Sequence, residues 1–595
     1  MFSYQQYFTD LLVVGAGLTG ERTAIEAASK GLKVIILSLV PPRRSHSSAA
    51  QGGVQASLGN SYMGRGDSPD IHFEDTVRGS DWGCEQPIVR IFVEEAPLAV
   101  RETAFWGMPW NRVEAGPWQL ADGSIVVEDE AKAGLIAARN FGGTQQWRTC
   151  YIADNTGHCL QYTLDSQVLK LGIDVRDRIE AVALIHDQEY CYGVIARCLR
   201  SGNFEVFQAG ATVIATGGCG RLYQDSTNAI INEGSGMAIA LETGVVPLGN
   251  MEAVQFHPTG IVPSAILITE GARGDGGYLL DKKLHRFMPD YEPQRKELAF
   301  RDIVARHMTM HMAQGFGVES DYGLHLWLDI RHLGANHIKA KLPGIADICQ
   351  TFNGLDPTSD LIPVRPVQHY TMGGIRTSLT GAAYGLKGLF AVGEAACWGL
   401  HGFNRLGGNS LAETLVAGKI TGQYIAETLQ FWRQEAANRL IRQTLLKEKT
   451  RVDSLTRCCS GENPYAILAE VKNILTTKVG IFRNDKDLTS AVTELGELLD
   501  RSNKVRLQVC DNLISPEISL ALRLQGIIKL ALCIACGALQ RTESRGSHYR
   551  TDFPVRDDKS WLTRTLATWP DDCRLPELHY EPVTITELPP EQRIL

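Results

Sequence analysis

The apolar and polar positions near the start of the chain predict a strand, a turn, a helix and a second strand. Residues 10–14 form a short apolar run that is typical of a buried strand, and a glycine follows at once. Residues 21–30 are rich in alanine and predict a helix, which Gly31 ends. Residues 33–37 form a second apolar run. This order is the opening of a dinucleotide-binding βαβ unit.

Later apolar runs extend this unit and then depart from it. Between residues 154 and 213, helical and strand-like pieces alternate, and the last strand leads into ATGG at 215–218. In a two-part dinucleotide fold, such a strand is the return of the first domain. Residues 60–150 show no clean periodicity. Between about 250 and 365 the pattern is no longer βαβ, which predicts a second domain.

The rest of the chain returns to the first domain and then becomes helical. A strand at 389–392 ends in Gly-Glu, and a loop at 401–409 leads into a helix from about Ser410. That helix offers a second N-terminus to a bound nucleotide. Residues 430–540 are mostly helical by spacing and charge, and the tail from about 550 predicts an extension lying on a surface. We therefore predict an α/β fold divided into residues 1–250, 251–365, 366–430, 431–545 and 546–595.

The turn after the first strand carries the sequence GAGLTG, with glycines at 15, 17 and 20. Gly15, Gly17 and Gly20 let the backbone close on a pyrophosphate, and the helix that follows offers amide donors. The second strand normally ends in an acid that binds the ribose hydroxyls. Here Ser38 stands in that place, which makes a plain NAD enzyme less attractive and leaves FAD open.

Composition and charge exclude some classes of protein. The chain has 595 residues, a net charge of -8 and no basic block, which argues against nucleic acid as a partner. No uninterrupted apolar run reaches the roughly 18 residues of a membrane span, and no signal peptide precedes the first strand. We expect a soluble, cytoplasmic chain. Cys533-x-x-Cys536 lies in an apolar helical segment, and we expect buried helix there and no metal.

Residues 44–53, RSHSSAAQGG, follow the second predicted strand. Small residues and paired glycines suit a place where the backbone approaches a flat ligand closely. The ring nitrogen of His46 is a nucleophile that could be bonded to such a ligand. Taken alone, the stretch is better explained as a polar loop with an ordinary surface histidine.

Motifs along nearly the whole chain resemble, in order, the flavoprotein subunit of the succinate dehydrogenase and fumarate reductase family. They are GAGLTG, RSHSSAAQGG, ATGG, QFHPTG, TEGARGDGG, RDIVAR, HYTMGG, AVGEAACWGLHGFNRLGGNS and RTESRGSHYRTDFPVRDDKSW. The details look most similar to quinol:fumarate reductases anchored by a dihaem cytochrome b. The resemblance implies a Rossmann-like FAD-binding domain with an inserted capping domain at 251–365. It also implies reduction of fumarate to succinate by hydride transfer from the flavin.

The resemblance also implies roles for individual residues. His46 matches the histidine joined covalently to the flavin 8α-methyl, and Arg301 matches the proton donor, with Glu270 and Arg273 as its relay. Residues that match holders of the substrate carboxylates are His257, Thr269, Glu270, His369 and Arg405. Positions that match FAD contacts are Gly15, Gly17, Gly20, Ser38, Gln51, Gly52, Gly53, Ala215, Gly217, Glu394, Arg405, Ser410 and Leu411. The acidic turn common in the family is shortened here, so either Glu233 replaces it or that FAD contact is missing.

The implied partners are an iron–sulfur subunit and a cytochrome b membrane anchor with haem and menaquinol, in a dimer of heterotrimers. The implied location is the cytoplasmic face of the cell membrane, held through these subunits. Three alternatives stay open. The enzyme could run in reverse as a succinate dehydrogenase, it could be a soluble oxidase such as an L-aspartate oxidase, or it could be a non-catalytic dinucleotide-binding scaffold. His46 argues against the oxidase, and the set of His257, Arg301, His369 and Arg405 argues against the scaffold.

Overall fold

The protein is represented by a computed structural model that describes residues 4–119, 125–128, 130–431, 435–457, 460–508, 514–571 and 573–593. Its largest sheet has the order β8-β2-β1-β11-β10-β9, with β18 paired to β11. The strands are β1 (Gln5–Val14), β2 (Val34–Ser38), β8 (Asp174–Asp177), β9 (Ile179–His186), β10 (Cys191–Cys198), β11 (Phe204–Ile214) and β18 (Leu389–Ala391). β8, β2, β1, β11 and β18 run parallel, so their carboxyl ends meet at one edge.

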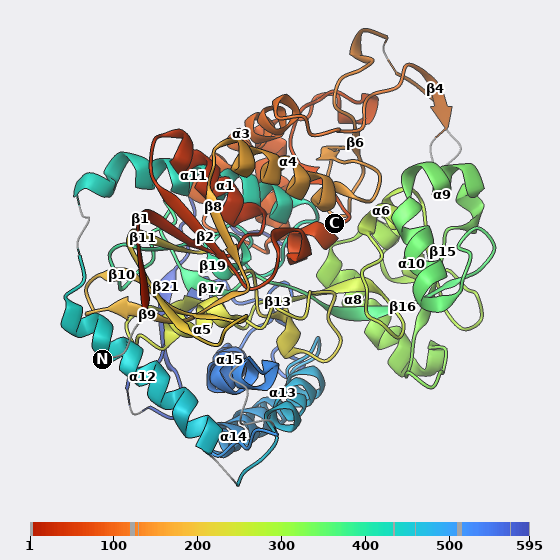
Figure 1. The fold of residues 1–595 in the computed structure, drawn as a ribbon. Helices are drawn as coiled ribbons and strands as arrows, with labels where there is room; N and C mark the ends of the chain where they lie inside the picture. The colour runs from red at the N-terminus through yellow and green to blue at the C-terminus, as the bar shows by residue number, and fades with distance from the viewer. Residues whose placement is uncertain are drawn as a thin grey trace.

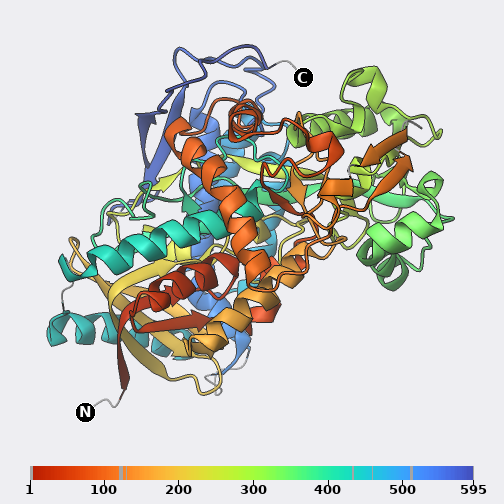
Figure 2. The same cartoon turned by 90° about the horizontal axis from the view of Figure 1, so that it is seen from above.

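Helices cover one face of this sheet, and four of them pack together (Figures 1 and 2). They are α1 (Leu18–Ser29), α3 (Gln86–Phe105), α4 (Thr156–Lys170) and α11 (Asn409–Thr428). α3 and α2 (Pro69–Gly79) lie in the stretch where the sequence shows no clean periodicity. Most side chains of α3 that face the core are fully buried among neighbouring helices. The exposed face of α3 includes the apolar residues Leu98 and Phe105, at 49% and 90% exposed, which blur the polar face that periodicity detects.

Residues 254–371 build a separate lobe, which lies to the right in Figures 1 and 2. Its sheet has the antiparallel order β13-β16-β15-β14. The lobe contains β13 (Val254–Ile261), α6 (Glu270–Gly274), β14 (Tyr278–Leu280), α7 (Met288–Tyr291), α8 (Arg301–His311), β15 (Leu326–Asp329), α9 (Ala335–Lys341), α10 (Pro343–Asn353) and β16 (Ile362–Thr371). An apolar core of its own fills the lobe. The domain boundary expected at 365 falls inside β16.

Four helices lie below the large sheet in Figure 1: α12 (Asn438–Arg457), α13 (Pro464–Lys478), α14 (Asp485–Arg501) and α15 (Pro516–Gln540). α15 is the one helix among the described residues that is long and apolar enough to cross a membrane. It is instead largely buried inside the protein, packed on α13, α14 and α5 (Ser235–Leu241). Cys533 and Cys536 lie in this helix, and burial raises the pKa of Cys536 to about 12, so the thiols belong to the core.

Residues 541–593 do more than lie on a surface. β20 (Thr563–Thr568) and β21 (Glu577–Pro582) join a sheet of the order β19-β17-β12-β20-β21. Arg541, Arg545 and Arg550 are fully buried and pair with acidic side chains, so residues 541–550 are interior structure, whereas residues 551–560 and most of 573–593 are exposed or half-buried. The shorter strands are β3 (Val54–Gln55), β4 (Gly116–Gln119), β5 (Ile125–Glu128), β6 (Ala138–Arg139), β7 (Thr149–Cys150), β12 (Leu248–Gly249), β17 (Gly374–Arg376) and β19 (Ala396–Cys397).

The burial of α15 makes a stability prediction. Leu524 is 0% exposed, so Leu524→Ala leaves a cavity and lowers the free energy of unfolding by about 2–5 kcal/mol. Leu446 on α12 is 56% exposed, and Leu446→Ala serves as the matched control with a change of roughly 0.5 kcal/mol or less. Denaturant unfolding followed by tryptophan fluorescence measures both. Equal effects of the two substitutions would contradict the burial of α15.

Candidate functional site

One cavity of about 910 Å³ lies at the carboxyl ends of β1, β2 and β11, between the large sheet and the lobe. Ligands of open α/β sheets bind at this edge. The structure brings nearly all the site residues expected from the sequence to this cavity: His46, Gly15, Gly17, Ser38, Gln51, Gly52, Gly53, Ala215, Gly217, His257, Thr269, Glu270, Arg301, His369, Glu394, Arg405, Ser410 and Leu411. Gly20 and Arg273 lie outside the cavity lining.

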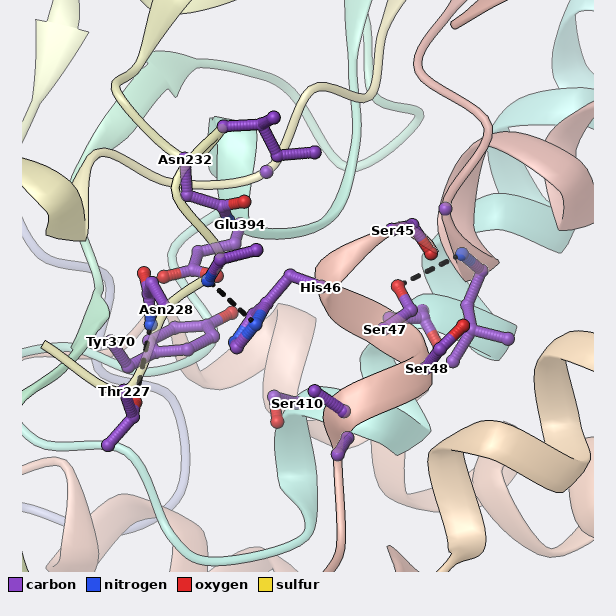
Figure 3. A pocket seen from close by; sticks show the side chains of 18 of the residues that line it. Ser45, His46, Ser47, Ser48, Thr227, Asn228, Asn232, Tyr370, Glu394 and Ser410 are labelled. Atoms are coloured by element: carbon purple, nitrogen blue, oxygen red, sulfur yellow. Dashed lines mark hydrogen bonds between the residues drawn. The ribbon is translucent and has the colours of Figure 1, made fainter. Parts of the chain in front are cut away.

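The glycine turn after β1 is held tightly against the end of β11. Gly15 has φ of +118°, and a Cβ there would lie 2.2 Å from the carbonyl oxygen of Ala215, so only glycine fits. Gly17 begins α1, where the N–H of Leu18 donates to Ser47 Oγ at 3.2 Å (Figure 3). Gly20 was expected to touch the cofactor. It instead faces Gly15, whose oxygen would lie 2.0 Å from a Cβ, so it allows close packing of α1 on the turn.

Two helix N-termini point at the cavity. α11 begins after Gly408, and the first-turn amides of Ser410 and Leu411 have no acceptor earlier in the helix. Together with the start of α1, they supply amide donors and the positive ends of two helix dipoles. Gly217, with φ of +74°, keeps the opposite wall free of side chains. A flat cavity edged by such donors fits FAD, which combines a planar ring system with a pyrophosphate.

A buried carboxyl also lines the cavity. Glu394 accepts a hydrogen bond from the backbone N–H of Thr371 at 2.9 Å, and burial raises the pKa of Glu394 to about 7. Ser38 Oγ donates to the carbonyl of Val40 at 2.6 Å, so it keeps only acceptor capacity toward a ligand. Glu233 lies outside the lining and pairs with Arg523 at 3.2 Å. Glu233 therefore does not replace the missing acidic turn.

His46 lies in a short 3₁₀ turn, His46–Ala49, and its ring points toward the loop that carries Thr227 and Asn228 (Figure 3). The backbone N–H of Ala229 donates to Nδ1 at 3.2 Å. With Nδ1 as acceptor, the neutral ring carries its proton on Nε2. Burial, with the charges of Arg221 and Arg405, lowers the pKa of His46 to about 4, so the ring is neutral at neutral pH.

The lobe contributes a chain of charged groups. Arg301, the first residue of α8, donates from Nε and Nη2 to Glu270 Oε2 at 2.8 and 2.6 Å. Arg273 Nη2 lies 3.9 Å from the other oxygen of Glu270. Burial alone would raise the pKa of Glu270, but the charges of Arg301 and Arg273 hold it below its ordinary value. The carboxylate is therefore ionised between two guanidinium groups.

Two histidines and a third guanidinium complete the polar cluster. The rings of His257 and His369 lie 4.9 Å apart, and burial with neighbouring arginines lowers both pKa values well below 6.5. Arg405 donates from Nη1 to Ser410 Oγ at 2.6 Å and lies over the ring of Tyr370 at 4.4 Å. Within the described residues, no carboxylate comes within ion-pair distance of Arg405. Burial and the charge of Arg301 lower its pKa to about 9, so the site lacks an anion there.

The sequence interpretation missed some residues of the site. Tyr370 lies in the HYTMGG motif beside His369, but no polar signal marked its ring as the support for Arg405. Its phenol donates to Glu413 at 3.1 Å, and His401 Nε2 lies 3.0 Å from the same carboxylate oxygen. Ser47 was read only as a small residue of the loop, although it accepts from the start of α1. Thr269 lines the cavity and also caps α6 through the N–H of Gly271.

Comparisons with known proteins agree with this geometry. The model of the FAD binding domain family matches residues 10–411, and the model described as fumarate reductase flavoprotein C-term matches 468–595. A fumarate reductase flavoprotein subunit of Helicobacter pylori is 47% identical over 614 residues, covering 98% of this chain and 86% of that protein. A succinate dehydrogenase flavoprotein subunit of Rickettsia bellii is 36% identical, covering 98% and 97%. A solved E. coli quinol fumarate reductase chain superimposes with a TM-score of 0.91 at 36% identity, covering 99% of each chain.

The raised pKa of Glu394 predicts how ligand affinity varies with pH. As pH rises through about 7, Glu394 becomes a carboxylate and competes with a bound dicarboxylate for the charge of Arg405. We expect the Kd of fumarate, fully ionised throughout, to rise several-fold between pH 6 and 8, since one pKa unit corresponds to about tenfold. Calorimetric titration of the oxidised protein measures it. Glu394→Gln should flatten the profile; an unchanged slope in this variant would assign the effect to another group.

Proposed function

The chain belongs to the family of fumarate reductase and succinate dehydrogenase flavoprotein subunits, and from this premise we propose that it reduces fumarate to succinate. It acts as the catalytic subunit of a quinol:fumarate reductase in anaerobic respiration. The observation that carries the proposal is the buried cluster of Arg273, Arg301, Arg405 and Glu270. The three guanidinium groups carry three positive charges and the carboxylate carries one negative charge. Two positive charges therefore remain to pair with the two negative charges of a dicarboxylate.

FAD is the cofactor that fits the cavity, and it supplies the hydride that reduces the alkene. The glycine turn and the starts of α1 and α11 hold the pyrophosphate, while Glu394 and Ser38 lie where polar groups of the cofactor pass. His46 is the residue that carries the covalent bond. Because the N–H of Ala229 donates to Nδ1, Nε2 is the ring nitrogen that would be joined to the flavin 8α-methyl, with loss of the proton that Nε2 carries in the neutral ring.

The dicarboxylate is held from both sides of the cavity. His257 and Thr269 belong to the lobe, and Arg405 belongs to the loop before α11. His257 Nε2 is buried without a hydrogen-bond partner in the structure, which is costly unless a substrate oxygen pairs with it. Contacts from opposite sides can turn one carboxylate out of conjugation and polarise the alkene, so that charge is stabilised as it develops.

Arg301 delivers the proton to the substrate carbon that does not receive the hydride. A guanidinium is a poor acid in water, so this step needs a dry site and immediate reprotonation. Glu270 accepts two hydrogen bonds from Arg301 and lies against Arg273, which continues the path away from the cavity. The three side chains are nearly inaccessible to water, which supports the relay.

Other subunits supply the electrons. We infer an iron–sulfur subunit and a cytochrome b anchor with haem that oxidises menaquinol, in a dimer of heterotrimers at the cytoplasmic face of the membrane. One solved relative with a TM-score of 0.91 is a quinol-fumarate reductase with menaquinol molecules, which supports menaquinol as the electron donor. Succinate dehydrogenase is the second candidate, because relatives at 36% identity carry that name. The same residues serve both directions, and the potentials of the partner subunits decide between them.

Arg301→Lys tests the proton donor. Lysine cannot reproduce the paired contacts of Nε and Nη2 with Glu270, so we expect kcat for fumarate reduction to fall by roughly 10²–10⁴-fold while flavin content stays normal. Reduced viologen dye as electron donor measures it. Arg331→Lys in the same lobe is the control, because Arg331 is half-exposed and pairs only with Asp329. Near-normal turnover of Arg301→Lys would overturn the assigned role.

His46→Ser tests the covalent bond. We expect FAD to stay bound through the glycine turn and the two helix N-termini, but to be released when the protein is denatured in acid. Succinate oxidation should fall more than fumarate reduction, because the bond is expected to raise the flavin potential. Flavin fluorescence on the denatured polypeptide and both activities of the complex are the measurements. Ser48→Ala on the same turn is the control, and flavin that also leaves the unmodified protein in acid would refute the bond.

A further inference from the structure

Ion pairs and hydrogen bonds outside the cavity hold α8 in place. Its first residue is Arg301, and its second is Asp302, whose side chain is 1% exposed. Arg593 donates to both oxygens of Asp302, from Nη1 at 2.8 Å and from Nη2 at 3.1 Å. Arg306, one turn further along α8, lies 3.2 Å from the same carboxylate. Nothing in the sequence marks Arg593 as a partner of α8.

Arg593 also contacts the body of the protein, by which we mean the described residues outside the lobe of residues 254–371. Its Nε donates to the carbonyl of Arg78 at 3.2 Å, and its Nη2 donates to that of Gly79 at 2.9 Å, at the end of α2. Its guanidinium stacks on Phe300, the residue just before α8, at 4.2 Å. One side chain therefore joins the end of α2 to the start of α8. Figure 1 places the end of the chain at this junction of body and lobe.

A second contact repeats the arrangement one turn along α8. Arg306 Nη1 donates to the carbonyl of Gly546 at 2.7 Å. The N–H of Gly546 in turn donates to Asp81 at 2.8 Å, and Arg545 donates to the carbonyl of Asp81 at 2.9 Å. Asp81 lies directly after α2, so both contacts run from α8 through residues 541–593 to the same corner of the body.

We propose that residues 541–593 form a strap that holds α8 against the body, and that Arg593 is a positioning residue for Arg301. The inference rests on the role proposed above for Arg301. α8 carries Arg301 into a cavity whose other wall, with His46 and Arg405, belongs to the body. A shift of α8 would separate the proton donor from substrate held by that wall, and a displacement of about 1 Å can cost roughly 10²-fold in rate.

The chemistry of the contact requires arginine. Arg593 donates hydrogen bonds to the carboxylate of Asp302 and to two carbonyls, its Nη1 lies 4.0 Å from Asp81, and its face packs on Phe300. A lysine ammonium is a point charge that cannot satisfy these directions together. Arg593→Lys should therefore rescue little of what Arg593→Gln loses.

The test compares Arg593→Gln and Asp302→Asn with Glu587→Gln in the complete complex. Glu587 pairs with Arg90 and ties the same strap to α3 without touching α8, so it is the matched control. For both strap variants we expect kcat for fumarate reduction with reduced viologen to fall about tenfold or more, with a smaller change in KM and normal flavin content. The double variant should lose less than the sum of the two single losses, because both substitutions remove the contact between Arg593 and Asp302. Glu587→Gln should keep its kcat.

Hydrogen exchange separates this inference from the role of Arg301. We expect backbone amides of α8 to exchange at least tenfold faster in Arg593→Gln and Asp302→Asn, and those of α9 to be unchanged. This readout needs no turnover, so it holds even where Arg301→Lys proves active and the proton-donor role fails. Unchanged exchange in α8 together with normal kcat in Asp302→Asn would overturn the strap. So would equal loss of kcat in Glu587→Gln.

Discussion

The site depends on a surplus of buried positive charge. Arg405 stacks on Tyr370 and donates to Ser410, but it meets no carboxylate within the described part of the chain. On the other wall of the cavity, the single negative charge of Glu270 neutralises only part of the positive charge of Arg301 and Arg273. Unpaired charge in a dry interior is expensive, and a dianion removes the cost. Recognition of a dianionic substrate therefore follows from unpaired positive charge that the packing of the fold keeps buried.

This excess of positive charge is assembled from segments that lie far apart in the sequence. His257 and His369 come from paired strands β13 and β16, whereas Arg405 comes from the loop before α11. The register of β13 with β16 sets the two imidazoles 4.9 Å apart. Burial keeps both neutral, so they can share the cavity with guanidinium groups without adding further repulsion.

Much of this could be predicted from local patterns. The strand, glycine turn and helix around Gly15 are specified within about thirty residues, and the structure has them as β1, α1 and β2. What escaped prediction depends on contacts over long separations. The exposed face of α3 carries the apolar residues Leu98 and Phe105, Tyr370 acts through its ring face, and Arg593 meets Asp302 across 291 positions. Gly20 was assigned to the cofactor because the motif is usually read as one unit, although its neighbour is Gly15.

The division of the site between two bodies explains why α8 needs external support. The buried carboxylate Glu270 and the guanidinium of Arg301 belong to the lobe, while His46 and Arg405 belong to the body. Like charges on the two walls repel each other until a dianion lies between them, so the protein alone would favour separation. Ion pairs on the far side of α8 oppose that repulsion without entering the cavity. Asp302, which forms one of these ion pairs with Arg593, follows Arg301 directly in the chain. The same helical turn therefore directs a cation into the cavity and an anion toward residues 541–593.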